Sequence, residues 1–172
     1  PELFQGGVSN IPESEIYGAE VELSTYVTAS MILDANLSWI ETEITADHFA
    51  LDNVQSDIAT NALLAQGVNQ FSDQVQIARA AEITNVKGNE LAKTPNFTAN
   101  LALTWEAYVE NWGELSNSLQ YVYRGDFKHR MFNNPLTDMV PDYEVLDFVL
   151  GFTPQSNNDL RFEFVAKNLT DE

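Results

Sequence analysis

Residues 160–167 read Leu-Arg-Phe-Glu-Phe-Val-Ala-Lys, so that one parity is Leu, Phe, Phe and Ala and the other is Arg, Glu, Val and Lys. Side chains on a β-strand point to opposite faces with a period of two residues. This stretch therefore predicts a strand with one apolar face and one mostly charged face.

Five earlier segments alternate in the same way, at residues 17–24, 33–40, 97–106, 115–124 and 145–152. Each apolar row covers about nine residues, which is the length that a tilted strand needs to cross a hydrocarbon core of roughly 30 Å.

The connections between these segments are short or long. Residues 28–30, 110–113 and 153–159 form short ones, whereas residues 46–96 and 125–142 form long ones. Both long connections therefore leave the same end of the predicted sheet. Short turns at one end and long loops at the other are typical of outer-membrane β-barrels.

Aromatic residues lie near the ends of the apolar rows, as in the interfacial girdles of membrane barrels. One end holds Tyr17, Trp39, Phe97, Tyr123 and Tyr143, and the other holds Trp105, Trp112 and Phe152. We therefore predict an all-β fold, an antiparallel transmembrane β-barrel with long external loops. The alternative is a soluble β-sandwich whose apolar faces pack on each other.

Six strands cannot close a barrel, and open edges in lipid leave backbone groups unpaired. We expect a fragment of a longer barrel, with Pro1 inside a domain and no signal peptide.

The composition excludes several classes of function. The chain has 26 acidic and 8 basic residues, for a net charge of -18, which disfavours nucleic-acid binding. No apolar run approaches the roughly 18 residues of a transmembrane helix. With no Cys, two His and no G-x-S-x-G, H-E-x-x-H or phosphate-binding Gly-rich loop, we expect no enzyme, cofactor or metal site.

The long connection after residue 46 carries helical spacing. Apolar residues recur at Ile58, Ala62, Leu63 and Ala65, and again from Phe71 onwards, with Gly67 between the two runs. This spacing predicts two short helices in an external loop. We expect their apolar stripe to pack locally against the barrel mouth rather than to form a ligand platform.

Polar residues on the other parity of the strands are expected to face a wet interior and to pair mostly with their neighbours across strands. These lumen-facing candidates are Glu20, Glu22, Asp34, Glu106, Gln120, Asp147, Arg161, Glu163 and Lys167.

A basic cluster lies where the fourth strand enters the second long loop. Arg124, Lys128, His129 and Arg130 include three of the eight basic residues within seven positions. They could bind an anionic substrate through charge-assisted hydrogen bonds. Contact with lipopolysaccharide phosphates at the outer rim is an equal alternative.

Four short sequences resemble successive landmarks of the C-terminal barrel of TonB-dependent outer-membrane receptors. They are Ile-Tyr-Gly-Ala-Glu-Val-Glu at 16–22, Gly-Asn-Glu-Leu-Ala-Lys-Thr-Pro at 88–95, Tyr-Val-Tyr-Arg at 121–124, and Lys-Asn-Leu-Thr-Asp at 167–171. Each is weakly specific, but their order and spacing match the strand pattern. The resemblance covers essentially all of residues 1–172.

The resemblance implies an active transporter in the bacterial outer membrane, in which about six of roughly 22 strands lie in this chain. It implies uptake of a scarce solute, most often a ferric siderophore, and partners that include lipid, lipopolysaccharide, a plug domain and the TonB complex. The plug, the TonB box and the terminal strand are not found in residues 1–172. A passive porin, which would lack the plug, is the alternative transport function.

Overall fold

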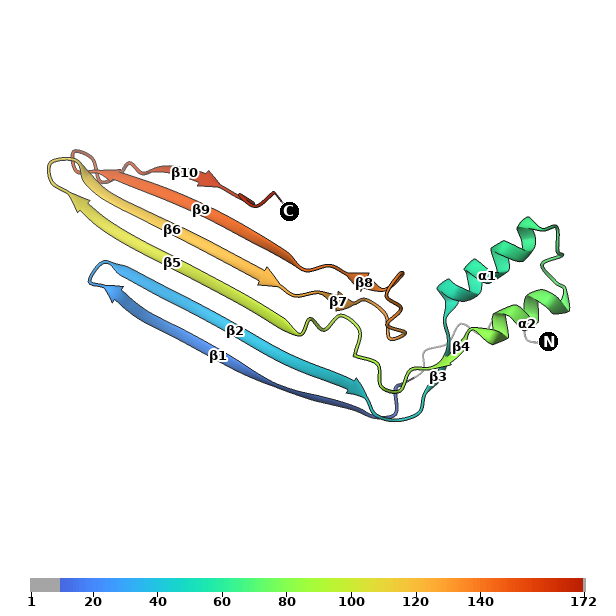
Figure 1. Ribbon diagram of the computed structural model, residues 1–172. Helices are drawn as coiled ribbons and strands as arrows, with labels where there is room; N and C mark the ends of the chain where they lie inside the picture. The colour runs from blue at the N-terminus through green and yellow to red at the C-terminus, as the bar shows by residue number, and fades with distance from the viewer. Residues whose placement is uncertain (1–9, 172) are drawn as a thin grey trace. The chain divides into compact units, whose positions relative to one another are not determined.

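The computed structural model describes residues 10–171, so the expectation about Pro1 falls outside the described residues. Six long strands form one sheet in the order β1-β2-β5-β6-β9-β10 (Figure 1). They are β1 (Ser14–Thr28), β2 (Met31–Ile44), β5 (Phe97–Val109), β6 (Gly113–Arg124), β9 (Tyr143–Pro154) and β10 (Phe162–Ala166). The pairs β2–β5, β5–β6, β6–β9 and β9–β10 are antiparallel. The six predicted strands are therefore confirmed as an open sheet in which each strand lies beside its predecessor among the six.

Five strands are longer than the nine residues expected from their apolar rows. The 13 residues of β5 extend over about 43 Å at roughly 3.3 Å per residue. Backbone pairing does not depend on side-chain polarity, so the ladder continues beyond the apolar row. The exception is β10, which has five residues and begins at Phe162. The N–H of Leu160 donates to the carbonyl of Asn157 at 3.2 Å in the preceding turn, so it is not available to the ladder.

The register gives the sheet an apolar face. Leu33 pairs with Leu103, which pairs with Leu119, which in turn pairs with Phe148, so these four side chains form one row across the sheet. Leu119 is 37 % exposed and Phe164 is 61 % exposed. The apolar face of this single layer is thus uncovered in the described part of the chain, and the soluble β-sandwich alternative is wrong.

Most of the predicted aromatic end of the apolar face is present. Trp39 pairs with Phe97, whose ring centroid lies 6.0 Å from that of Tyr123. Tyr143 was expected here as well, but it pairs with Arg124 on the opposite face. The parity of β9 places Tyr143 with the polar residues, because its neighbour Glu144 takes the apolar-side position opposite Tyr123.

The turn between β5 and β6 depends on Gly113. Its φ of +139° is rarely adopted by residues with a side chain, and a Cβ there would lie 2.1 Å from the carbonyl oxygen of Thr153. Glycine therefore permits the close approach of β6 and β9 at this end of the sheet.

The first long connection contains the predicted helices, α1 (Asn53–Ala65) and α2 (Asp73–Ala81). The side chains of Asp52 and Ser72 cap their N-termini, and Gly67, with φ +82°, follows α1. The short strands β3 (Phe49–Leu51) and β4 (Ile83–Asn85) pair at the base of the helices. No helix within residues 10–171 combines the length and apolar character needed to span a bilayer.

The second long connection contains a small two-stranded sheet of β7 (Phe127–Lys128) and β8 (Met139–Val140). The chain divides into two compact units, which we call the sheet unit and the loop unit. Among the described residues, the sheet unit holds Gly18–Ile40, Pro95–Phe127 and 140–171. The loop unit holds residues 10–17, Glu41–Thr94 and Lys128–Met139.

Candidate functional site

The sheet unit has a polar face, opposite the apolar one. Its register aligns Asp34, Ala102, Gln120 and Asp147 in one row. A second row contains Glu106, Ser116, Gly151 and Glu163. The structure therefore brings together on one face the lumen-facing candidates of β2, β5, β6, β9 and β10.

The candidates on β1 join the same face through Asn36. The amide nitrogen of Asn36 donates to Glu20 at 3.4 Å and to Glu22 at 3.1 Å. Glu22, Asp34 and Asn36 line an open hollow of about 370 Å³ together with residues of β5 and β6. Carboxylate and amide oxygens in this hollow can accept hydrogen bonds from a polar solute.

Arg161 lies on the polar face just before β10. Its Nε donates to Glu163 at 2.9 Å and its Nη2 donates to the Ser116 hydroxyl at 3.3 Å. A Cβ at Gly151 would lie 2.9 Å from that Nη2, so the absent side chain leaves room for the guanidinium. Both side chains of this ion pair are at least half exposed, and exposed pairs contribute about 0.2–1 kcal/mol to stability. Lys167 follows the last residue of β10, outside the strand pairs.

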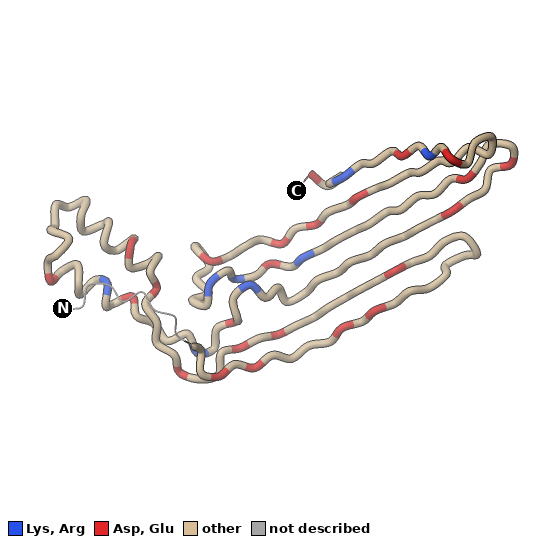
Figure 2. Tube along the Cα trace, turned by 180° about the vertical axis from the view of Figure 1, so that it is seen from behind, with Lys and Arg blue, Asp and Glu red and all other residues tan. Residues whose placement is uncertain are grey.

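Acidic positions occur on all six long strands, whereas basic positions are few, and three of the eight lie within residues 124–130 (Figure 2). Glu20, Glu22, Asp34, Glu106, Asp147 and Glu163 give the polar face its acidic character. A solute that contacts this face therefore meets mostly hydrogen-bond acceptors.

The four residues of the predicted basic cluster are divided between the two units and have different partners. Arg124 belongs to the sheet unit, where its guanidinium carbon lies 4.4 Å from the ring centroid of Phe127. Lys128 and His129 belong to the loop unit, where the Lys128 ammonium donates to the Met139 sulfur at 3.3 Å. The Nδ1 of His129 contacts the Asp138 carbonyl oxygen at 3.0 Å.

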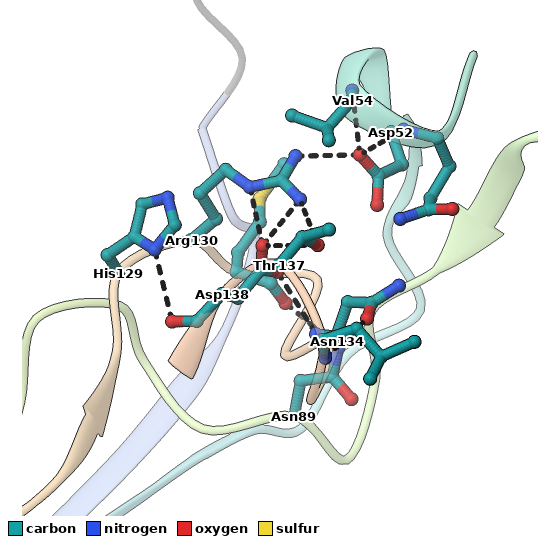
Figure 3. A network of polar contacts seen from close by, with 11 residues as sticks. Asp52, Val54, Asn89, His129, Arg130, Asn134, Thr137 and Asp138 are labelled. Carbon is teal, nitrogen blue, oxygen red and sulfur yellow. Dashed lines mark hydrogen bonds and ion pairs between the residues drawn. The ribbon is translucent and has the colours of Figure 1, made fainter. Parts of the chain in front are cut away.

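Arg130 is the centre of a polar network in the loop unit (Figure 3). Its Nη1 donates to Oδ1 of Asp52 at 2.6 Å, and its Nε donates to Oδ1 of Asp138 at 2.7 Å. Nη2 lies 2.5 Å from the same Asp138 oxygen and 3.1 Å from the Thr137 hydroxyl. The Arg130 side chain is 19 % exposed, whereas the Asp138 side chain is fully buried. Because two carboxylates surround one guanidinium, the three residues together carry a charge of -1.

Arg130 and Asp138 have shifted pKa values. Burial lowers the pKa of Arg130, but its hydrogen bonds and ion pairs with Asp52 and Asp138 outweigh that effect and raise it overall. Burial raises the pKa of Asp138, but hydrogen bonds from the Asn134 backbone, the Arg130 side chain and Thr137 outweigh it and lower that pKa. The ionised form of Asp138 is therefore stabilised.

Sequence reasoning found Arg130 but missed its partners. Asp52 is recognisable in the sequence as a helix N-cap, and it does accept from the N–H of Val54 at 3.0 Å. Its ion pair with a residue 78 positions away has no local signal. Asp138 and Thr137 read as ordinary loop residues. Within residues 10–171, His, Asp and Glu side chains form no group of three suited to hold a metal ion.

The comparisons with known proteins agree with this fold. A search of curated proteins finds no match. Among solved structures, the ferric yersiniabactin uptake receptor FyuA from Yersinia pestis is similar, with a TM-score of 0.62 and 16 % sequence identity. The likeness covers 92 % of this chain, which spans 19 % of that receptor. The family model described as TonB dependent receptor-like, beta-barrel, matches residues 4–169. This chain therefore belongs to the TonB-dependent receptor β-barrel family.

Proposed function

We propose that this chain forms part of the wall and two external loops of a receptor that takes up a scarce solute across the bacterial outer membrane, driven by TonB. The observation that carries the proposal is a single sheet with an uncovered apolar face and a continuous polar face. An uncovered apolar face suits lipid, and the polar face suits a water-filled lumen. Membership of the TonB-dependent receptor family supports the energised transport.

Residues 1–172 belong, in this proposal, to the C-terminal part of the barrel domain. The polar face lines the lumen, and it contacts the receptor's own plug domain and the passing solute. Lipid and lipopolysaccharide contact the apolar face and the outer rim. The role is transport and not catalysis.

A ferric siderophore is the proposed cargo. The similar receptor FyuA is described as a ferric yersiniabactin uptake receptor, and this likeness supports the choice of cargo by analogy of fold. The polar hollow on the sheet supplies acceptors for hydroxyl or amide groups of such a ligand.

In this proposal, an anionic complex binds to Arg124, Lys128 and His129. Arg130 was expected to share this role, but its charge is already matched by Asp52 and Asp138. Charge reversal by Lys128→Glu should weaken uptake if Lys128 contacts the cargo. Unchanged uptake with altered lipopolysaccharide binding would instead place Lys128 at the rim.

Uptake of radiolabelled ferric siderophores by cells that express the complete receptor tests the proposal. We expect accumulation in cells with TonB and none in otherwise identical cells without TonB. Accumulation that is equal in both strains would indicate a passive porin. A receptor that transports other TonB-dependent solutes but no ferric siderophore would retain the transporter and overturn the cargo.

A further inference from the structure

Arg130 joins two long connections that are far apart in sequence. Asp52 lies in the first connection, between β2 and β5, and Asp138 lies in the second, between β6 and β9. The guanidinium binds carboxylates from both, at 2.6 Å and 2.7 Å. Its carbon also lies 5.3 Å from the ring centroid of Phe132. A planar guanidinium with several fixed donors is suited to hold two partners in one orientation.

The Asp52 end of this contact controls the start of α1. The same Oδ1 that accepts from Arg130 accepts from the N–H groups of Val54 and Gln55, at 3.0 and 3.3 Å. Arg130 therefore holds the N-cap of the helix and, through it, the first turn of α1.

The Asp138 end is held just as firmly in the second connection. Its Oδ2 accepts from the Asn134 N–H at 3.0 Å, and its Oδ1 accepts from the Thr137 hydroxyl at 3.1 Å. The carboxylate has no exposed surface, so it depends on these donors and on Arg130 for compensation of its charge.

Neutral hydrogen bonds connect the two loops at a second place. The Asn89 amide donates to the Met131 carbonyl at 2.8 Å, and the Lys93 N–H donates to the Lys128 carbonyl at 2.7 Å. These bonds lie after β4, whereas the Arg130 contact reaches the segment before α1. One attachment precedes the helical pair in sequence and the other follows it, and two attachments restrict the motion of the pair more than one would.

We propose that Arg130 is a positioning residue that makes the α1–α2 pair and residues 128–139 move as one body. The ion triad formed by Asp52, Arg130 and Asp138 is in this view a clasp between loops and not a binding site for an anion. The effect of this clasp on transport rests on the proposed function. In a transporter, the cargo would bind loops that the clasp already holds in one arrangement. The clasp itself exists whether or not the receptor is a transporter.

The test uses the complete receptor in detergent or in membranes, with spin labels at Ala62→Cys and Leu136→Cys and any other cysteine removed. Ala62 is exposed on α1, and Leu136 is 92 % exposed in the second connection, so both accept a label. Pulsed electron-spin resonance then reports the distribution of distances between the two loops. We expect a narrow distribution for the parent protein and a clearly broader one for Arg130→Ala.

Two further variants make the result specific. Asp52→Asn keeps an N-cap acceptor but removes the charge, so it should broaden the distribution with α1 still formed. Lys87→Ala removes an exposed ion pair with Asp47, at 3.9 Å in the same connection, and should leave the distribution narrow. Arg130→Lys should give a distance distribution nearly as broad as that of Arg130→Ala, because an ammonium lacks the planar set of donors that bridges both carboxylates.

Transport gives a separate readout. We expect Arg130→Ala to raise the KM for radiolabelled ferric siderophore about tenfold, with the maximal rate per receptor retained. Equal distance distributions in the parent and Arg130→Ala proteins would overturn the clasp. Absence of any siderophore uptake by the parent would overturn the cargo and leave the spectroscopic result standing.

Discussion

Arg130 and Asp52 lie 78 positions apart in sequence, yet Nη1 of the first donates to Oδ1 of the second at 2.6 Å. Asp52 is also the N-cap of α1, so one carboxylate oxygen serves a helix and an ion pair. Removing Arg130 leaves Asp138 buried without its charged partner, a change that typically costs about 3–5 kcal/mol. Substitution of Arg130 should therefore lower the stability of the loop unit more than substitution of any exposed charged residue around it.

Acid should loosen the loop unit in a defined range of pH. The pKa of Asp138 is lowered in the folded protein, so its ionisation contributes stability above its ordinary pKa of about 3.9. This contribution decreases as the pH falls below about 4 and is lost below the folded pKa. We expect the loop distance distribution to stay narrow at pH 5 and to broaden progressively as the pH falls below about 4. In Asp138→Asn, which cannot titrate, this part of the pH dependence should be absent.

Asp52→Ala should disturb α1 more than Asp52→Asn does. Alanine removes both the acceptor for Val54 and Gln55 and the partner of Arg130, and loss of an N-cap alone costs about 1 kcal/mol. Hydrogen exchange of the complete receptor should show faster exchange in the first turn of α1 for Ala than for Asn. Equal rates would mean that the cap contributes nothing beyond the ion pair.

Gly113→Ala should destabilise the turn between β5 and β6. The new Cβ would meet the Thr153 carbonyl oxygen at 2.1 Å, and the φ of +139° adds strain of about 1–3 kcal/mol. Gly67→Ala is a matched control, because Gly67 also has a positive φ but a Cβ there has no atom within 4 Å. Thermal unfolding in detergent should show a larger decrease in Tm for Gly113→Ala than for Gly67→Ala.

A pair of adjacent substitutions distinguishes the two faces of the sheet. Leu119 lies in the apolar row and Gln120 lies in the polar row, on the same strand. Arginine on the lipid face of a barrel costs about 2–4 kcal/mol near the bilayer middle. We expect Leu119→Arg to lower the yield and stability of folded receptor in membranes, and Gln120→Arg to leave both nearly unchanged. If both variants lost the same amount, the assignment of the faces would be wrong.

Local alternation was enough to predict the sheet, because the row from Leu33 through Leu103 and Leu119 requires each strand to keep its own parity. The two helices followed from spacing and from Gly67. Tyr143 was misplaced because aromatic residues near a strand end suggest a girdle on either face, and register alone decides between them. The start of β10 was misplaced because the Leu160 N–H is used in a turn.

The loop network was beyond sequence reasoning for a different reason. Arg130 was read with its sequence neighbours Lys128 and His129 as a positive patch, since no pattern links it to Asp52 across the four strands and two helices between them. Ion pairs between distant loops depend on the tertiary structure, which a period of two or of 3.6 residues does not encode. The consequence for function is large, because an unpaired arginine attracts anions and a paired one does not.

All fifteen residues of β1 are exposed, and the strand forms one edge of the sheet. A long edge strand of a sheet is a template for a further strand, from the same chain or from another molecule. Residues 1–172 produced by themselves should therefore self-associate into insoluble material, with β1 as a growth point. Proline substitutions along β1 would slow that precipitation, which a simple turbidity measurement can follow.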